Sequence, residues 1–254
     1  MAERGERRVV LVTGAGTDGI GRAVVRRIAD PGTAVAIHCH GARNGADMLA
    51  REATGRGTDA SVHPADFTAE GSGRALVEGV VARHGRLDAL VHCAAATVRR
   101  PAMETTTEDL DRLLAVNVRG TFEVIRATAA HLLARGAPGR IVIVSSVNQQ
   151  LVVPGQVAYS ATKGAVMQMA KTFALELART GIAVNLVAPG TIETDLNRHL
   201  LADPAFRALR EGPIPMGRVG LPAEVAGAVA YLLSEEARYV TGATLAVDGG
   251  LSLP

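Results

Sequence analysis

The sequence predicts an α/β protein built on one doubly wound, mainly parallel seven-stranded sheet with helices on both faces. Short apolar runs alternate with longer segments of helical period along the 254 residues, and no Ser-rich or Pro-rich linker interrupts them. Several runs consist almost entirely of Val, Ile, Leu and Ala, which is typical of strands covered on both faces. Parallel strands need right-handed crossovers, so helices are expected on both sides of the sheet.

The strands are expected where these apolar residues cluster between turns. In chain order they are RVVLVT at 8–13, AVAIH at 34–38, ASVH at 60–63, LDALVH at 87–92, RIVIVS at 140–145, AVNLV at 183–187 and TLAV at 244–247. Helical patterns fill the intervening segments, and Pro222 is placed to start the last helix. Because ligands of open parallel sheets bind outside the carboxyl ends of the strands, residues just after each strand are the first candidates for function.

The composition predicts a single globular domain over residues 1–254. With 27 basic and 25 acidic residues the formal charge is +2, so binding to nucleic acid or a membrane surface has little electrostatic support. There is no long unbroken apolar run, and the first ten residues lack the apolar centre of a signal peptide. We therefore expect a cytoplasmic protein.

Cysteine and histidine usage predicts neither a disulfide nor a metal site. Cys39 and Cys93 end apolar runs, where small reduced thiols pack well. His38 and His40 share one strand face but have no third or fourth ligand nearby. Free thiols and the absence of a bound metal are the expectations.

A glycine-rich turn directly follows the first strand. Gly14, Gly16, Gly19 and Gly21 lie between that strand and a helix, which is the context of a dinucleotide pyrophosphate site. There the backbone can approach phosphates closely, and free N–H groups at the helix start face negative charge. By itself the spacing also fits a tight turn, so both interpretations stay open.

Tyr159 and Lys163 lie one helical turn apart on the same face. A phenol titrates near pH ~10, but an ammonium ~4 Å away in an effective dielectric of about 20 would lower its pKa by ~3 units, equivalent to roughly 4 kcal/mol. We therefore expect a tyrosine able to move a proton near neutrality. An exposed pair without a role is the alternative at this point.

An ordered set of short motifs extends along almost the whole chain. These are TGAGTDGIG, PADF, VHCAAA, AVNVRGTF, IVIVSSV, AYSATKGAV, IAVNLVAPGTIETDL, PMGRVGLPAEVA and YVTGATLAVDGG. With them the sequence resembles the short-chain dehydrogenase/reductases over essentially its full length, and it looks most like the 3-oxoacyl-[acyl-carrier-protein] reductase group. The resemblance implies a Rossmann-type NAD(P)-binding domain, a small-molecule carbonyl or alcohol substrate, and a homotetramer.

The same resemblance implies four catalytic residues. Tyr159 would exchange a proton with the substrate oxygen, and Ser146, thirteen residues earlier, would hydrogen-bond that oxygen. Lys163 would lower the phenol pKa and bind the nicotinamide ribose. Asn117 would hold a water that links Lys163 to solvent.

Cofactor contacts are implied for a larger set that follows the strands. It comprises Gly14, Thr17, Asp18, Gly19, Ile20, Gly21, His40, Asp66, Phe67, Cys93, Ala94, Ile192 and Thr194, with Tyr159 and Lys163. Asp66 and Phe67 would lie by the adenine, and Ile192 and Thr194 by the carboxamide and phosphate end.

Two departures from the family pattern affect these expectations. The glycine loop has one extra residue between Gly14 and Gly19, which leaves phosphate contacts from Thr17 and Asp18 open. Where the family commonly has N-N-A-G, this chain has HCAA at 92–95, so we expect the asparagine bonds that stiffen the sheet centre to be lost.

The end of the second strand favours NADP, with NAD as the alternative. No acidic residue occurs there before Asp47 to bind a 2′-hydroxyl, whereas His40 and Arg43 suit a 2′-phosphate. Asp18 argues the other way, because NADP-dependent relatives often have a basic residue in that loop.

Residues 191–215 form the longest stretch without a strand and are expected to form a substrate lid. We expect Leu196, Leu200 and Leu201 to face inward, with Arg198 and His199 outward. The polar residues at 148–150 could line the pocket.

The substrate stays open at the sequence level. For a 3-oxoacyl-[acyl-carrier-protein] reductase, Arg135 and Arg179 could dock an acyl carrier protein. The polar residues Asn148, Gln149 and Gln150 and the segment GTIETDLN also resemble sugar and polyol dehydrogenases of the same family. A catalytically weak cofactor-binding sensor or scaffold is the alternative of another class.

Overall fold

The sheet is confirmed and is parallel throughout. In the computed structural model, which describes residues 7–253, the strand order is β3-β2-β1-β4-β5-β6-β7. The strands are β1 (Arg8–Thr13), β2 (Thr33–Cys39), β3 (Asp59–Pro64), β4 (Ala89–His92), β5 (Gly139–Val144), β6 (Ile182–Pro189) and β7 (Thr244–Val247). The order reverses between β1 and β4, so the crevice expected to bind ligands lies at their carboxyl ends.

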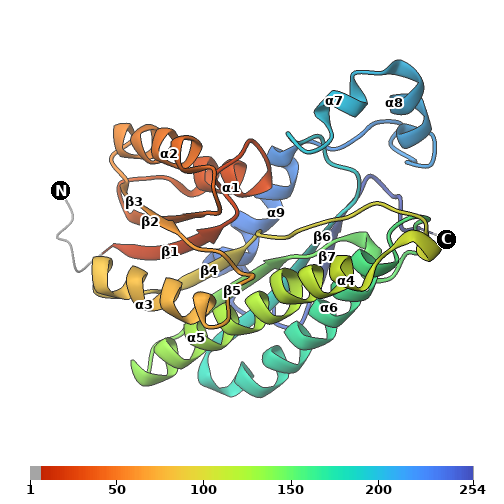
Figure 1. Ribbon diagram of the computed structural model, residues 1–254. Coiled ribbons are helices and arrows are strands. Elements are labelled where there is room, and N and C mark those ends of the chain that lie inside the picture. Colours follow the sequence, from red (N-terminus) through yellow and green to blue (C-terminus); the bar gives the residue numbers. More distant parts are fainter. Residues whose placement is uncertain (1–6, 254) are drawn as a thin grey trace.

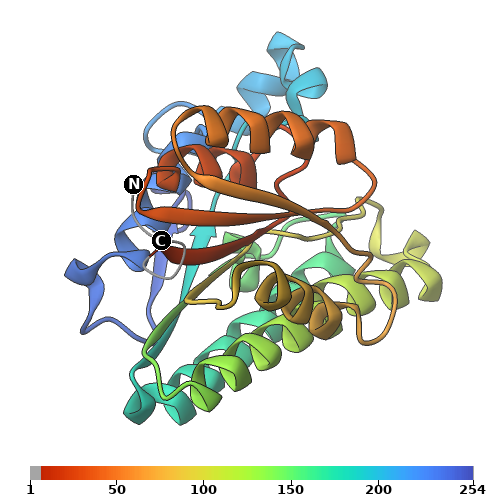
Figure 2. The same ribbon diagram turned by 90° about the vertical axis from the view of Figure 1, so that its left-hand side faces the viewer.

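Helices cover both faces of this sheet (Figures 1 and 2). One face carries α1 (Ile20–Ile28), α2 (Arg43–Gly55) and α9 (Pro222–Leu233), and the other carries α3 (Ser72–His84), α5 (Thr121–Ala134) and α6 (Val157–Leu177). The segment α4 (Thr107–Leu113) continues through a π-helical turn, η2 (Leu114–Gly120), into α5. Short 3₁₀ turns are η1 (Ala102–Glu104), η3 (Val147–Gln149), η4 (Ala178–Thr180) and η5 (Glu235–Ala237). None of the helices in the described residues is long and apolar enough to span a membrane.

The strand pattern explains the two helical layers. Successive residues of a strand point to opposite faces, so Leu11 and Ile141 pack with α3, α5 and α6, while Val12 and Val142 pack with α1, α2 and α9. All four side chains are fully buried. The continuous apolar runs in the sequence therefore reflect burial on both faces, as expected.

The fourth strand begins two residues later than its apolar run. Asp88 precedes it, accepts the Val9 amide at 2.8 Å, and forms ion pairs with Arg86 at 2.7 Å and Arg135 at 3.0 Å. The proposal that Arg135 docks an acidic carrier is not supported by this arrangement, because its guanidinium is already held against Asp88 and the Leu87 carbonyl.

The segment at 191–215 forms two short helices that stand above the carboxyl ends of the strands (Figure 1). These are α7 (Arg198–Leu201) and α8 (Pro204–Glu211). Leu201 is buried against Ile214 and Val219, as expected of an inward side chain. Leu196 and Leu200, however, are 73% and 44% exposed, so their predicted inward orientation is wrong. Because α7 is only one helical turn long, it buries a single leucine, Leu201, in the small apolar cluster with Ile214 and Val219.

Candidate active site

The loop between β1 and α1 has the backbone geometry of an anion site. Gly14 has a left-handed φ of 68°, and a Cβ atom there would lie 2.8 Å from the Ala94 backbone, so glycine is required. Gly19 precedes α1 without a side-chain cap, and the first turn of the helix has no acidic residue. The Ile20 amide has no acceptor in the described part of the chain. Free donors at a helix N-terminus suit the phosphates of a dinucleotide.

The remaining cofactor candidates lie along the same edge of the sheet. His40 follows β2, Asp66 and Phe67 follow β3, Cys93 and Ala94 follow β4, and Ile192 and Thr194 follow β6. Thr17 is exposed in the glycine loop. A Cβ atom on Gly19 would lie 3.7 Å from the Thr194 methyl group, so the two ends of the crevice face each other.

The four expected catalytic side chains form one cluster. Ser146 follows β5, Tyr159 and Lys163 share α6, and Asn117 lies in η2. The Lys163 Nζ lies 5.5 Å from the centre of the Tyr159 ring, and Ser146 hydrogen-bonds the phenol. Thr162 connects the last member, because its hydroxyl accepts from Asn117 Nδ2 at 3.0 Å and donates to the Tyr159 carbonyl at 2.8 Å.

Burial, rather than the lysine, dominates the ionisation of the phenol. It raises the pKa of Tyr159 to about 12, and the hydrogen bond from Ser146 opposes the rise. Burial also lowers the pKa of Lys163 to about 8. The expected lowering of the tyrosine pKa is therefore wrong for the protein alone. Both groups lose water, and Lys163 Nζ donates to the Val144 carbonyl at 3.3 Å.

The Asn117 side chain is fully engaged with the backbone and Thr162. Its Oδ1 accepts the Ala96 amide at 2.7 Å, and its Nδ2 donates to the Ala96 carbonyl at 2.9 Å. The residue is buried within the π-helical turn. Of its polar groups, the main-chain carbonyl is the one available to a water, and Thr121 already donates to it at 2.6 Å.

A buried chain of hydrogen bonds runs from the end of β1 to this carbonyl through His92. The Thr13 hydroxyl oxygen accepts two amides, those of Cys93 at 3.0 Å and Ala94 at 3.1 Å, and lies 3.0 Å from His92 Nδ1. On the other side of the ring, His92 Nε2 lies 2.9 Å from the Thr121 hydroxyl.

The hydrogen bonds of Thr13 and Thr121 determine which nitrogen of His92 carries the proton. The Thr13 oxygen already accepts two amides, so its proton goes to Nδ1; the Thr121 proton goes to a carbonyl, so its oxygen accepts from Nε2–H. Burial lowers the pKa of His92 to about 3, in keeping with this neutral form. The asparagine bonds expected to be lost are absent, but His92 makes other bonds in their place and joins β1, β4 and α5.

His38 supports the glycine loop from below. Its Nδ1 accepts the Gly14 amide at 3.1 Å, and its Nε2 lies 3.1 Å from the Ala65 carbonyl. Phe67 is stacked on the His38 ring with centres 4.6 Å apart and contacts His92 at 5.6 Å. The Phe67 ring is buried, so only its backbone can face an adenine.

The acidic and basic groups expected near the adenosine are exposed. His40 Nε2 lies 3.6 Å from an Asp66 carboxylate oxygen, and Arg43 lies 3.7 Å from Asp47. Cys39 and Cys93 are both free, as predicted, and burial raises the pKa of the Cys93 thiol to about 12. No cluster of metal-ligating side chains occurs within residues 7–253.

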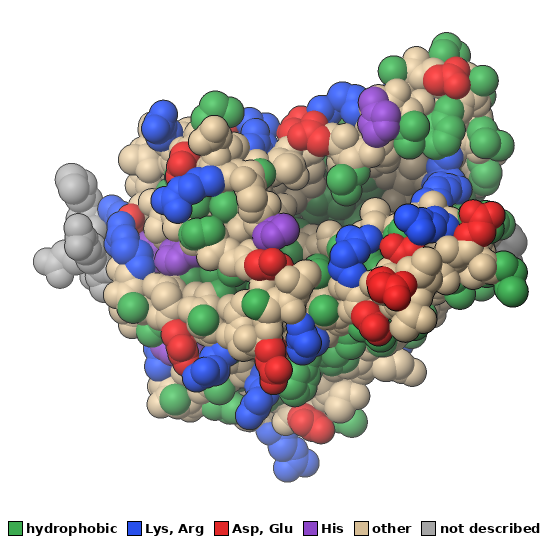
Figure 3. All heavy atoms as spheres, viewed as in Figure 1, with side chains coloured by type: hydrophobic (Ala, Val, Ile, Leu, Met, Phe, Trp, Pro, Cys, Tyr) green, Lys and Arg blue, Asp and Glu red, His purple; other side chains and the backbone are tan. Residues whose placement is uncertain are grey.

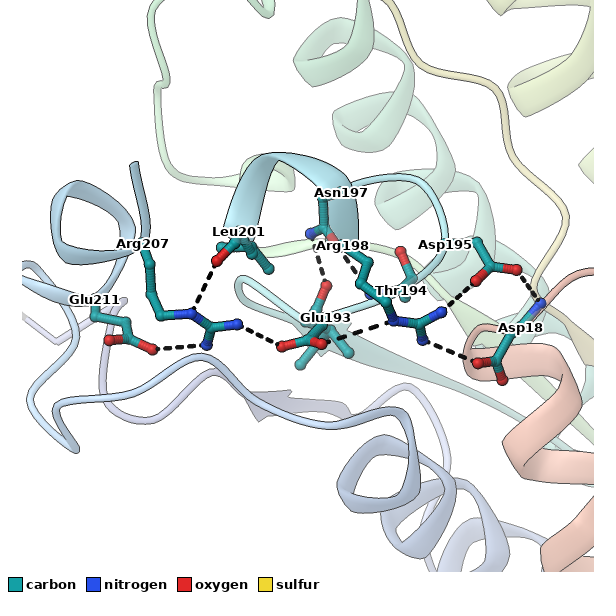
Figure 4. Close-up of polar contacts among 10 residues, drawn as sticks. Asp18, Glu193, Thr194, Asp195, Asn197, Arg198, Leu201, Arg207 and Glu211 are labelled. Carbon is teal, nitrogen blue, oxygen red and sulfur yellow. Dashed lines mark hydrogen bonds and ion pairs between the residues drawn. The ribbon is translucent and has the colours of Figure 1, made fainter. Parts of the chain in front are cut away.

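The extra residue of the glycine loop binds the segment after β6 (Figure 4). The Asp18 amide donates to Asp195 Oδ2 at 2.8 Å, and the Asp195 amide returns a bond to the Asp18 carbonyl at 3.0 Å. Arg198 joins both carboxylates and lies 3.7 Å from Glu193. Arg207 extends the network from Glu193 to Glu211. Asp18 is thus committed to the α7 segment rather than to the 2′-position of a nucleotide.

Known proteins resemble this chain along almost its whole length. A family model described as enoyl-(acyl carrier protein) reductase matches residues 14–252. The 3beta-hydroxysteroid dehydrogenase 1 of Eggerthella lenta is 38% identical over 97% of this chain and 94% of its own length. Glucose 1-dehydrogenase 2 of Bacillus subtilis is 38% identical over 97% and 95%, respectively. The structure of a gluconate 5-dehydrogenase from Burkholderia cenocepacia with NADP and tartrate is 38% identical, covers 97% of this chain and 96% of its own, and has a TM-score of 0.90.

The chain belongs to the short-chain dehydrogenase/reductase family. It is an NAD(P)-dependent oxidoreductase that acts on CH–OH or C=O groups. The predicted family and enzyme class are confirmed. The relatives named above act on steroids and sugars, which favours the predicted alternative over a 3-oxoacyl-[acyl-carrier-protein] reductase.

In this dehydrogenase/reductase the polar residues at 148–150 divide between two places. Asn148 lies beside Ser146: its main-chain amide donates to Ser146 Oγ at 3.2 Å, its Oδ1 accepts from that hydroxyl at 3.5 Å, and its Nδ2 donates to Gln156 Oε1 at 2.6 Å. Gln149 and Gln150 instead line a separate cavity of about 320 Å³ with Lys171. Another cavity, of about 330 Å³, lies at the ends of β6 and β7. Neither cavity is lined by Tyr159. A hollow opens on the surface below the segment at 191–215 (Figure 3).

Several polar residues of the site were not predicted from the sequence. They are Thr13, His92, Thr121, Gln156 and Thr162. Their positions carried a usable signal, since each directly ends a strand or lies within four residues of a predicted catalytic residue. The hydrogen-bond partners, however, come from residues up to 81 positions away and are set by strand order.

Proposed function

We propose that this short-chain dehydrogenase/reductase oxidises a hydroxyl group of a sugar, sugar acid or polyol with NADP as the preferred cofactor. The observation that carries the substrate class is the polar wall beside the phenol, where Ser146, Asn148 and Gln156 form a connected set of hydrogen-bonding groups. A substrate with several hydroxyl groups can satisfy such donors and acceptors, whereas an acyl chain cannot.

Each residue of the cluster has a role in the proposed reaction. Tyr159 removes the hydroxyl proton during oxidation and returns it during reduction. Ser146 hydrogen-bonds the same substrate oxygen, where charge develops. Lys163 holds a positive charge beside the phenol, and Asn117 fixes the turn that faces it. When bound, the nicotinamide cofactor accepts or supplies the hydride.

The residues present fit a nicotinamide dinucleotide. The α1 N-terminus supplies amides for the phosphates, and the ammonium of buried Lys163, with Val144 as its hydrogen-bond acceptor, has donors to spare for a ribose. His40 and Arg43 would bind a 2′-phosphate. The Asp18 carboxylate is turned toward Arg198 of α7, with which it forms an ion pair at 2.9 Å.

The proposed function is tested by a substrate screen with both nicotinamides. We expect oxidation of at least one sugar, sugar acid or polyol, no reduction of an acetoacetyl thioester, and a Michaelis constant for NADP at least tenfold below that for NAD. The absorbance of the reduced nicotinamide measures the rate of both substrate oxidation and substrate reduction. Reduction of the thioester without oxidation of any polyhydroxy compound would overturn the substrate class, and tenfold better use of NAD would overturn the cofactor preference.

The contact between Asp18 and the α7 segment is proposed to close the 191–215 lid over the bound cofactor. Exposed ion pairs contribute about 0.2–1 kcal/mol each, so Asp18→Asn and Arg198→Gln should each speed NADPH dissociation roughly 1.5- to 5-fold. Stopped-flow fluorescence measures this rate. Arg26→Gln is the matched control, because Arg26 forms an equally exposed pair with Glu52 at 3.0 Å on α1 and α2. Equal rates in all three variants would contradict the proposal.

A homotetramer is also proposed. The helices that carry Asn117 and Tyr159 leave apolar side chains exposed, among them Leu114 and Phe122 near η2 and Val157 and Leu175 on α6. Packing these faces between subunits would bury them.

A further inference from the structure

Two arginines beside the lid have no carboxylate partner. Arg99 lies in the segment after β4, and Arg210 lies in α8. The other arginines around the lid are paired, as shown by Arg100 with Asp109 at 3.3 Å, Arg198 with Asp18 at 2.9 Å, Arg207 with Glu193 at 2.9 Å and Arg218 with Glu224 at 2.6 Å. Within residues 7–253, Arg99 and Arg210 form no ion pair.

Both side chains are anchored next to parts of the catalytic site. Arg210 Nη2 donates to the Thr191 hydroxyl at 3.1 Å, two residues beyond the end of β6. The Arg99 stem lies against Gly155, since a Cβ atom on that glycine would be 3.5 Å from Arg99 Cγ. Gly155 is four residues before Tyr159 and accepts the amide of the residue after Arg99 at 2.9 Å. Arg210 is therefore held at the end of β6, and the stem of the exposed Arg99 lies beside the segment that leads into Tyr159.

Basic side chains, interspersed with acidic ones, lie around the end of the hollow next to the segment at 191–215 (Figure 3). Arg210 is half-buried, and its pKa is lowered first by burial and then by repulsion from Arg99, so the two positive charges act on each other. Charged side chains are rarely buried without a partner, because desolvation of an unpaired charge is costly. A bound anion would relieve both the burial cost and the repulsion.

We propose that Arg99 and Arg210 bind an anionic group of the substrate, a carboxylate or a phosphate, at the end of the molecule away from the reacting carbon. Guanidinium groups present paired N–H donors that match both anions. Together with the hydroxyl-binding groups Ser146, Asn148 and Gln156, the pair selects a polyhydroxylated anion, such as a sugar acid or a sugar phosphate, over a neutral sugar. This inference rests on the proposed function.

Steady-state kinetics with D-gluconate, D-glucose 6-phosphate and D-glucose test the selection. Arg99→Gln and Arg210→Gln should each raise the KM for the preferred anion roughly 10- to 100-fold, the usual effect of losing a charge-assisted hydrogen bond, and leave the KM for D-glucose within threefold. Arg210→Lys should recover part of the loss. Arg100→Gln is the matched control, since Arg100 is paired with Asp109. A lower KM for D-gluconate than for D-glucose 6-phosphate would indicate that the arginines bind a carboxylate, and the opposite order would indicate a phosphate.

Binding measured without turnover separates this inference from the proposed function. In the Tyr159→Phe background with NADP bound, calorimetry should show that the preferred anion binds at least tenfold more tightly than D-glucose, and that Arg99→Gln removes the difference. Equal binding of anion and neutral sugar, or a loss as large in Arg100→Gln, would overturn the inference. A chain that binds the anion but oxidises nothing would overturn the proposed function alone.

Discussion

Tyr159→Phe is expected to lower kcat by about 10²- to 10⁴-fold while cofactor binding stays within threefold of the unmodified protein. The substitution removes one hydroxyl group and keeps the ring that packs beneath Lys163 Nζ. Because the phenol is the group proposed to exchange a proton with the substrate oxygen, turnover should fail and binding should survive. Stopped-flow absorbance reports the chemical step, and calorimetry reports cofactor affinity.

Tyr239→Phe is the control for this substitution. Tyr239 is fully exposed near β7, so its hydroxyl should have no effect on either measurement. More than a tenth of the original kcat in Tyr159→Phe would contradict the assigned role. Equal losses in both tyrosine variants would show that the effect is not specific to the site.

The high pKa of the Tyr159 phenol determines in which direction of the reaction it can give up its proton directly. At neutral pH Tyr159 is protonated in the protein alone, because burial raises its pKa to about 12. It is thus a ready donor for carbonyl reduction but must be deprotonated for alcohol oxidation. The charge on Lys163 favours that deprotonation, although burial lowers the pKa of the ammonium to about 8. Sequence spacing alone predicted the attraction between the two groups and omitted the loss of water that both undergo.

The fold was predictable because its signals are local. Each strand is an apolar run, and RVVLVT and TLAV coincide with β1 and β7 as observed. The order of the motifs likewise placed Ser146, Tyr159 and Lys163 around one crevice. These features depend on residues close in sequence or on a strand order shared by doubly wound sheets.

The remaining features depend on contacts between distant segments. The commitment of Asp18 to Arg198 spans 180 positions, and nothing near Asp18 in sequence indicates it. The HCAA segment was expected to lack the asparagine bonds of the family; the sequence does not show that the two nitrogens of His92 reach hydroxyl groups on neighbouring elements instead. The predicted inward orientation of Leu196 and Leu200 was wrong for a related reason. A helix of one turn and the residues beside it have too little surface to bury three leucines.

The two buried histidines predict steep acid unfolding. Burial lowers the pKa of His38 to about 4 and that of His92 to about 3, whereas both should titrate near 6.5 in the unfolded chain. Below pH ~6.5 these two sites therefore bind up to two more protons in the unfolded state than in the native state, and together they lower the stability by about 3 kcal/mol for each unit that the pH falls. By pH ~4 the loss from these two sites is about 6 kcal/mol, comparable with the whole stability of a typical domain. Above pH ~7.5 this contribution is complete and no longer changes.

His92→Asn separates proton linkage from simple damage to the core. The variant should be less stable at pH 7.5, because the bonds to Thr13 and Thr121 are lost, yet its stability should fall less steeply between pH 6 and pH 5, by about 1 kcal/mol per pH unit, because one titrating group is gone. Urea unfolding at pH 7.5, 6.0 and 5.0 gives both quantities, with exposed His199→Asn as the control for removing a histidine. An unchanged slope in His92→Asn would mean that His92 is not held neutral in the native protein. The hydrogen-bond chain from Thr13 to the Asn117 carbonyl would then need a different proton arrangement.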